Sequence, residues 1–155
     1  MTPRVRAMVV YVASRLISQA ESSFVFDFSG PGHRSMGGTV NEQCVNVYDY
    51  SENCQLTGHN SAGVFQLFHH QEKVHVSLQI SGESFHGFDH GAGSRFGGIV
   101  NGAKISVYDE GAHRQYAYWC EALKSTPLTG PETGVAEIES DPEARESGPG
   151  NPIGE

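Results

Sequence analysis

The sequence predicts an all-β fold of five tandem β-hairpin repeats, each about 20 residues long, with about ten antiparallel strands in residues 21–120. Three observations support this prediction. The stretch "SMGGTVNEQCVNVYDY" at residues 35–50 returns as "RFGGIVNGAKISVYDE" at residues 95–110. Residues 21–120 divide without gaps into five blocks of twenty, and the eighth residue of every block is aromatic. The chain also has 19 glycines, which favour turns and sheets over helices.

The first twenty residues have two interpretations. Apolar residues at near-helical spacing predict a short helix with one apolar face, which would cap an open array of repeats: Val5, Val9, Val12 and Leu16. Alternatively, two arginines before an apolar run and small residues at 18 and 20 are typical of a secretory signal, although Arg15 interrupts the run. The segment is too short and too charged to span a membrane.

Each block of twenty has the pattern of a hairpin. It begins with a β-favouring run such as "CVNVYD", continues with a polar or glycine-containing loop, and ends with an alternating run such as "KVHVSLQI". A lone hairpin is marginal in water, so two arrangements remain open: a hairpin solenoid, or a closed barrel or sandwich. The period and the regular aromatics resemble the choline-binding repeats of bacterial surface proteins, but the Gly-Trp and Trp-Tyr-Tyr signatures are absent, so no ligand is carried over.

The alternation of strand side chains divides each block into two faces. The apolar residues at positions five, seven, sixteen, eighteen and twenty share a face and predict the core. The aromatic residue at position eight has the opposite parity; this aromatic column comprises Phe28, Tyr48, Phe68, Phe88 and Tyr108. Three interpretations stay open: a bulge or second layer buries the rings, the rings stack on a saccharide or another flat ligand, or they form a self-association surface.

Polar residues follow the aromatic column directly. Asp49, Asp89 and Asp109 predict turns in which the carboxylate accepts backbone N–H groups two residues on, and beside the column they are also candidate ligand-binding residues. The alternative is a site for zinc or another divalent metal, formed by His69, His70, His86, Asp89 and His90.

Charge and cysteine content limit the partners and the compartment. The net charge of −8, with scattered basic residues, argues against nucleic acid as a partner. Cys44, Cys54 and Cys120 are expected to be free thiols, which favours the cytoplasm, although Cys44 and Cys54 could pair across a hairpin; a secretory signal would instead place the protein outside. Residues 121–155 are predicted to be a disordered acidic tail.

Repetition favours a non-enzymatic binding or scaffolding module without a cofactor, because a catalytic site is a single constellation and every distinctive feature here is multiplied. The expected ligand is a saccharide, a polymer with repeating spacing, or a protein that includes a second copy of this chain. Two alternatives remain: a metal-binding protein or metal-dependent enzyme that uses the His and Asp residues above, and a structural filament subunit.

Overall fold

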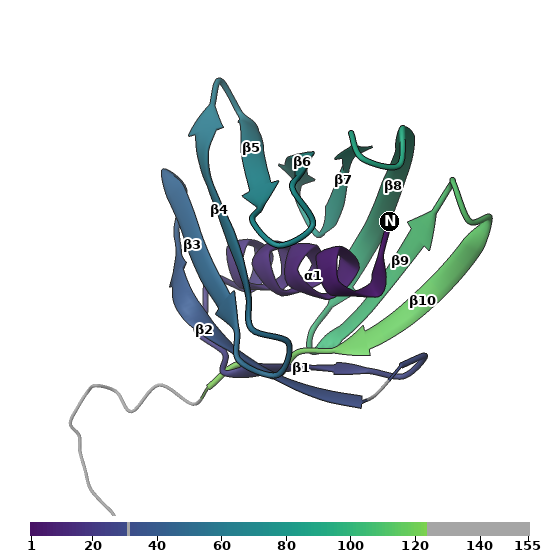
Figure 1. The fold of residues 1–155 in the computed structure, drawn as a ribbon. Coiled ribbons are helices and arrows are strands. Elements are labelled where there is room, and N and C mark those ends of the chain that lie inside the picture. Colours follow the sequence, from purple (N-terminus) through teal and green to yellow (C-terminus); the bar gives the residue numbers. More distant parts are fainter. Residues whose placement is uncertain (31, 124–155) are drawn as a thin grey trace, which may run out of the picture. The chain divides into compact units, whose positions relative to one another are not determined.

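The computed structural model describes residues 1–30 and 32–123. Ten antiparallel strands form a closed barrel of successive hairpins around one helix, α1 (Pro3–Ser18) (Figure 1). The predicted hairpin repeats are confirmed. Of the two arrangements, the closed barrel is right and the solenoid is wrong. The expected acidic tail falls, from residue 124 onward, outside the described residues.

Each strand pairs with its neighbour in the chain, and the last strand closes on the first. The strands are β1 (Phe24–Asp27), β2 (Gly32–Val40), β3 (Cys44–Asp49), β4 (Cys54–Ser61), β5 (Val64–His69), β6 (Val74–Ser81), β7 (Ser84–Asp89), β8 (Ser94–Asn101), β9 (Lys104–Asp109) and β10 (Arg114–Trp119). The closing contact is short, since only Phe26 with Trp119 and Asp27 with Tyr118 pair there. Closure covers the outer strand edges that an open array would expose.

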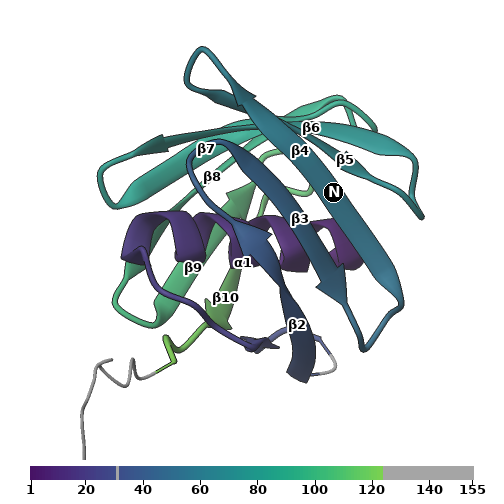
Figure 2. The same cartoon turned by 90° about the vertical axis from the view of Figure 1, so that its left-hand side faces the viewer.

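Helix α1 lies inside the barrel, with strands around it in two perpendicular views (Figures 1 and 2). Its start is fixed by Thr2, whose hydroxyl accepts from the backbone N–H of Val5, and it ends at Gln19 in the left-handed conformation. Every residue from Val5 to Arg15 is buried. The expectation of a one-faced helix capping an open array is therefore wrong, because a helix enclosed on all sides buries its whole circumference.

Two buried arginines on α1 bond to the wall. Arg6 Nε donates to Tyr118 Oη at 2.8 Å, and the Arg6 guanidinium lies 3.5 Å from the ring centroid of Tyr116. At the other end of the helix, Arg15 Nη1 donates to the carbonyl of Gly38 at 2.8 Å. The helix is thus held by polar contacts as well as by its apolar side chains.

The two faces of the strands follow the predicted parity. The inward positions are buried in β3, β5, β6, β8 and β9, including Val45, Val47, Phe65, Leu67, Val76, Leu78, Phe96, Val100, Ile105 and Val107. The repeated Gly-Gly pairs belong to this pattern. A Cβ at Gly98 would lie 2.3 Å from Ser106 O and 2.5 Å from the Phe85 ring, and a Cβ at Gly38 would lie 2.1 Å from Asn46 O. The Gly-Gly pair that recurs after sixty residues therefore lies in β2 and in β8. In both strands the neighbouring strand closely approaches the inward glycine.

The first hairpin departs from the twenty-residue period. The first strands of the later hairpins end at Asp49, His69, Asp89 and Asp109, at intervals of twenty, whereas β1 ends at Asp27, 22 residues before Asp49. Phe26 therefore occupies the place in the aromatic column that the period assigns to Phe28. Phe28 lies in the loop after β1, and the assignment of Phe28 to the column is wrong.

Candidate binding site on the outer wall

The last residue of the first strand in every hairpin is buried and stabilises the following turn. The acceptors are Oδ1 of Asp27 for Ser29 N at 2.8 Å, of Asp49 for Ser51 N at 2.9 Å, of Asp89 for Gly91 N at 2.8 Å and of Asp109 for Gly111 N at 3.0 Å. His69 Nδ1 accepts from Glu72 N at 3.0 Å. The turn chemistry predicted for Asp49, Asp89 and Asp109 is confirmed.

The same aspartates place their second oxygen toward buried positive charge. Asp49 Oδ2 lies 3.5 Å from Arg34 Nη1, and the α-amino group of Met1 lies 3.3 Å from Asp109 Oδ2 and 3.7 Å from Asp89 Oδ2. These carboxylates are at most 3% exposed. They serve the turns and the barrel interior, and they do not face the outer surface where the aromatic column lies.

The candidate metal residues do not converge. His69 is buried, and burial lowers the pKa of its imidazole. The other three histidines are exposed and have separate partners: His70 contacts Thr57 Oγ1 at 2.8 Å, His86 contacts Gln79 Oε1 at 2.9 Å and His90 contacts Ser77 Oγ at 3.1 Å. Within residues 1–30 and 32–123, no group of three His, Cys, Asp or Glu side chains lies close enough to hold a metal ion.

The three cysteines are free, as expected. Cys44 is exposed, whereas Cys54 and Cys120 are buried. Cys44 pairs in register with His59, and Cys54 pairs with Asp49, at the opposite end of the same hairpin. A disulfide between Cys44 and Cys54 is therefore a wrong expectation, because the two residues occupy different ends of the β3–β4 pair.

The aromatic column lies on the outer wall. Tyr48, Phe68 and Phe88 are half-buried, and Tyr108 is 43% exposed. The strand registers run through these positions without a break, so the interpretation that a bulge turns the rings into the core is wrong. Three of these rings pack on the residue two positions later, with centroids 5.1 Å apart for Tyr48–Tyr50, 5.0 Å for Phe68–His70 and 4.9 Å for Phe88–His90. In the described part of the chain these contacts form separate pairs rather than a continuous ladder.

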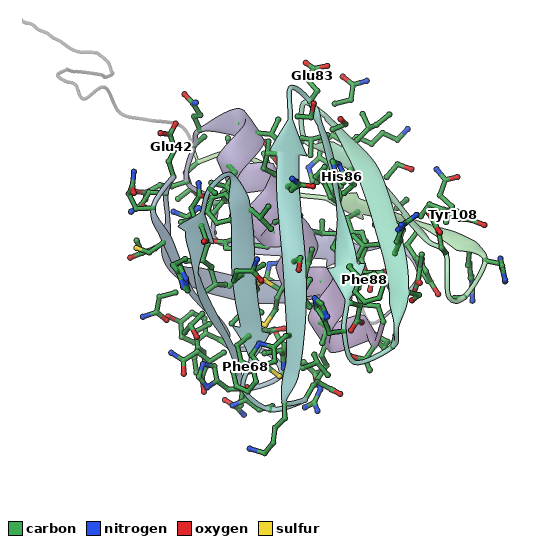
Figure 3. All side chains as sticks on the ribbon, turned by 90° about the horizontal axis from the view of Figure 1, so that it is seen from above. Glu42, Phe68, Glu83, His86, Phe88 and Tyr108 are labelled. Atoms are coloured by element: carbon green, nitrogen blue, oxygen red, sulfur yellow. The ribbon has the colours of Figure 1, made fainter. Side chains whose placement is uncertain are left out.

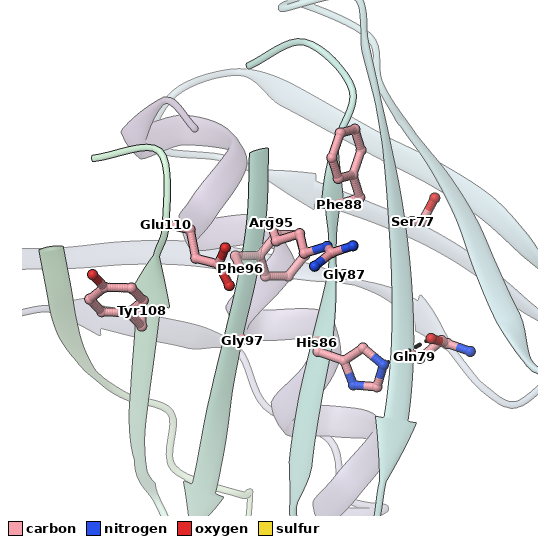
Figure 4. Close-up of a pocket in the computed structure, with 10 residues that line it drawn as sticks. All are labelled: Ser77, Gln79, His86, Gly87, Phe88, Arg95, Phe96, Gly97, Tyr108 and Glu110. Atoms are coloured by element: carbon pink, nitrogen blue, oxygen red, sulfur yellow. Dashed lines mark hydrogen bonds between the residues drawn. The ribbon is translucent and has the colours of Figure 1, made fainter. Parts of the chain in front are cut away.

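A groove of about 450 Å³ opens on the outer wall over β6 to β9. Phe88 and Tyr108 both line it; Gly97 lies between Tyr108 on β9 and His86 on β7, and Phe88 lies two residues further along β7, beside Arg95 (Figure 4). The polar groups that line it include Arg95 and Glu110. In the view from above, Phe88, Tyr108 and His86 all belong to this side of the barrel, and Phe68 lies apart from them (Figure 3). We call this feature the Gly97 groove.

The groove is open because β8 carries no side chain at its outward position 97. A Cβ at Gly97 would make only ordinary contacts, 3.4 Å from Phe85 O and 3.6 Å from His86 Cβ. Gly87, which also lines the groove, is different: a Cβ there would lie 1.9 Å from Ser77 O, so packing requires this glycine. No steric requirement therefore demands a glycine at position 97, and its consequence is an open floor between Tyr108 and His86.

The sequence identified the two walls of this groove but not its floor or its polar groups. Phe88 and Tyr108 are column residues, and His86 was a metal candidate. Gly97, Arg95 and Glu110 were missed as site residues. One signal was available: a glycine at an outward strand position, beside a column aromatic of the next strand, leaves a gap in the surface.

The fold and this geometry define a closed hairpin-repeat barrel with a helix in its centre and a groove on its outer wall. Comparison with protein-family models, with curated proteins and with solved structures finds no match to this chain. In the part of the chain that the structure describes, no helix has the length and apolar character needed to cross a membrane.

Proposed function

We propose that this protein is a carbohydrate-binding module, and that the Gly97 groove takes a sugar ring between Phe88 and Tyr108. The observation that carries the proposal is a groove lined by two aromatic rings, Phe88 and Tyr108, whose floor beside Tyr108 has no side chain at Gly97. A pyranose presents apolar C–H faces and a polar edge of hydroxyl groups. Aromatic faces suit the first of these, and an open floor admits a ring of this thickness.

The polar groups of the groove suit the edge of a sugar. Arg95 offers only donors and Glu110 only acceptors when ionised, so hydroxyl groups, which donate and accept, complement both. His86 and Gln79 are joined by a hydrogen bond of 2.9 Å, which orients both side chains at the margin of the groove. The volume of about 450 Å³ is within the range of small-ligand sites.

Binding rather than hydrolysis is favoured by the carboxylates of the groove. Glycosidases generally use two carboxyl groups on either side of the scissile bond. Glu110 is the single carboxylate among the residues that line the Gly97 groove. The nearby Asp89 and Asp109 are buried in turns and belong to the inner side of the wall.

A glycan array probed with the full-length protein tests this proposal, followed by calorimetric titration of the strongest ligand. The informative variants are Phe88→Ala and Phe68→Ala. Both rings occupy the same place in their hairpins and pack on a histidine two residues later, at 4.9 Å and 5.0 Å. Phe68 also packs on His75 at 4.8 Å, so we expect Phe68→Ala to cost at least as much stability as Phe88→Ala. Only Phe88 lines the groove. We expect Phe88→Ala to weaken binding about tenfold or more, equivalent to about 1.4 kcal/mol, and Phe68→Ala to leave it unchanged.

Two results would reject the proposal. The first is a folded wild-type protein that binds no glycan of the array. The second is an equal loss of binding in Phe88→Ala and Phe68→Ala, which would trace the effect to stability and not to the groove.

Self-association is a second candidate function, favoured by exposed aromatic residues where β1 meets β10. Phe28 is 60% exposed, Trp119 39% and Phe26 36%, and Phe26 pairs with Trp119 across the closing contact. We propose that a second copy covers these rings. Sedimentation velocity at two concentrations tests this: a concentration-dependent dimer that Phe28→Ser abolishes supports it, and a monomer at both concentrations contradicts it.

A further inference from the structure

A second region of the barrel, at the C-terminal end of α1, has the features of a small-molecule site. Two cavities of about 360 and 310 Å³ lie there and share Leu16, Gln19 and Glu42. The larger cavity is also lined by Arg15 and Val40. It therefore combines an arginine, a carboxylate and an apolar wall in one open pocket. This region is separate from the Gly97 groove, and no residue lines both.

Arg15 is the unusual member of this set. It is 9% exposed, and its Nη1 group is used by the protein: it donates to Gly38 O at 2.8 Å and to Tyr11 Oη at 3.2 Å. Its Nε has no hydrogen-bond partner in the described part of the chain. None of the ion pairs formed by the described residues includes Arg15. The carbonyl end of α1 offsets part of this charge, but no carboxylate of the described residues complements the guanidinium, whose Nε is buried without a partner.

A carboxylate is the natural complement of this unpaired charge, because hydrogen bonds between a guanidinium and a carboxylate are strengthened by the opposite charges. A simple anion is a poor ligand here, however. Glu21 and Glu42 are exposed and line the same cavity, so they repel a second negative charge and attract a cation. Leu16 and Val40 supply apolar surface between the charged groups. The cavity therefore complements a small molecule that carries both charges and an apolar part.

We propose that this cavity binds a free amino acid with an apolar side chain. Its carboxylate pairs with Arg15, its ammonium group is held by the acidic rim of Glu42 and Glu21, and its side chain packs on Leu16 and Val40. The cavity is large enough for a ligand of this size. The proposal does not depend on saccharide binding at the Gly97 groove.

Isothermal titration of the full-length protein with three probes tests the proposal. The probes are leucine, 4-methylpentanoate, which lacks the ammonium group, and 3-methylbutylamine, which lacks the carboxylate. We expect leucine to bind and each analogue to bind at least about tenfold more weakly, since each loses one charged contact of about 1.4 kcal/mol.

Two glutamates give a matched pair of variants. Glu42 lines the cavity, whereas Glu83 is an exposed glutamate in the turn between β6 and β7 that does not line it (Figure 3). We expect Glu42→Gln to weaken leucine about fivefold while 4-methylpentanoate binds as well as before or better, because the repulsion is reduced. Glu83→Gln should change neither affinity.

Arg15→Gln removes the charge that pairs with the carboxylate, and it should abolish leucine binding in a protein that still melts cooperatively. If that variant does not fold, because the bond from Arg15 to Gly38 is lost, the comparison of Glu42→Gln with Glu83→Gln decides alone. The proposal is overturned if the wild-type protein binds no leucine at millimolar concentration, if 4-methylpentanoate binds as tightly as leucine, or if the two glutamate variants behave alike.

Discussion

The ring of Tyr50 lies against Gly37. A Cβ on that glycine would be 3.3 Å from Tyr50 Cε2 and 3.5 Å from Tyr50 Oη, so the tyrosine covers the gap that the glycine leaves in the outer wall. Gly97 is the equivalent glycine of the passage that recurs sixty residues later, and no side chain of the described residues covers the gap there. The passage that the sequence repeats thus forms a closed surface on β2 and a groove on β8.

The residue that makes the difference is Glu110. Tyr50 N donates to Ser35 O at 2.8 Å, and Glu110 N donates to Arg95 O at 3.0 Å, so the backbones of the two residues occupy equivalent positions in their hairpins. A tyrosine at the first place covers its glycine, whereas a glutamate at the second stands at the edge of the groove. This exchange between repeats contributes to a groove on one side of the barrel.

Adjacent glycines on β8 should respond differently to the same substitution. A Cβ at Gly98 would lie 2.3 Å from Ser106 O, so we expect Gly98→Ala to reduce the free energy of unfolding by about 2 kcal/mol or more. Gly97→Ala meets only ordinary contacts and should stay within about 1 kcal/mol of the wild type. Urea unfolding followed by circular dichroism checks both, and equal losses would contradict the assigned faces of the two residues.

The buried pair of Arg34 and Asp49 gives a second prediction. Asp49→Asn keeps Oδ1 as an acceptor for the turn but removes the charge that lies 3.5 Å from Arg34 Nη1. We expect a loss of about 3 kcal/mol, at the low end for such a pair, because Glu52 lies 3.9 Å from the same nitrogen. The double variant Arg34→Met with Asp49→Asn removes both charges of this pair and should recover part of the loss. A double variant no more stable than Asp49→Asn alone would show that the charge does not matter.

The stability of the barrel should fall in mild acid because of His69. Burial lowers the pKa of this imidazole, and Nδ1 needs its lone pair to accept from Glu72 N. In the unfolded chain a histidine takes up a proton near about pH 6.5. Protonation therefore favours unfolding: the contribution of His69 is complete above about pH 6.5 and is lost as the pH decreases toward the lower pKa of the folded state.

Two variants isolate this effect in thermal melts between about pH 6.5 and pH 5.5. His69→Asn retains an acceptor for the turn and should flatten the pH dependence, whereas His90→Asn, at an exposed histidine of the next hairpin, should keep the wild-type profile. A slope that survives in His69→Asn would assign the acid sensitivity to another group.

The repeats and the faces of the strands could be predicted because they follow from local alternation. Side chains alternate between the two faces of a strand, and this alternation alone predicts that the aromatic column points outward. The structure confirms this for Tyr48, Phe68, Phe88 and Tyr108. The shift of the first hairpin was less visible, although Asp27 at the start of a turn and "SGPG" at residues 29–32 were signals that the strand ends early. The period alone could not show a displacement confined to one repeat.

The position of α1 and the cover over the glycines depend on the tertiary structure. The helix has arginines at positions 6 and 15, which suggest an exposed side until Tyr118, Tyr116 and Gly38 are seen to bind them. Whether an outward glycine leaves a groove depends on a side chain from the next hairpin. The sequence shows the outward glycines and the residues of the next hairpin, but it does not show which of these residues lies close enough to cover a glycine.

The most direct test of the groove as a saccharide site is the affinity of the Glu110→Tyr variant for the strongest glycan of the array. Glu110 is exposed, so the variant should fold, and its ring should cover Gly97 as Tyr50 covers Gly37. For Glu110→Tyr we predict a loss of affinity of about tenfold or more at an unchanged melting temperature. The reverse exchange at the equivalent residue of the earlier repeat, Tyr50→Glu, should leave the affinity as in the wild type, because Tyr50 does not line the groove. An unchanged affinity in a folded Glu110→Tyr protein would contradict the account.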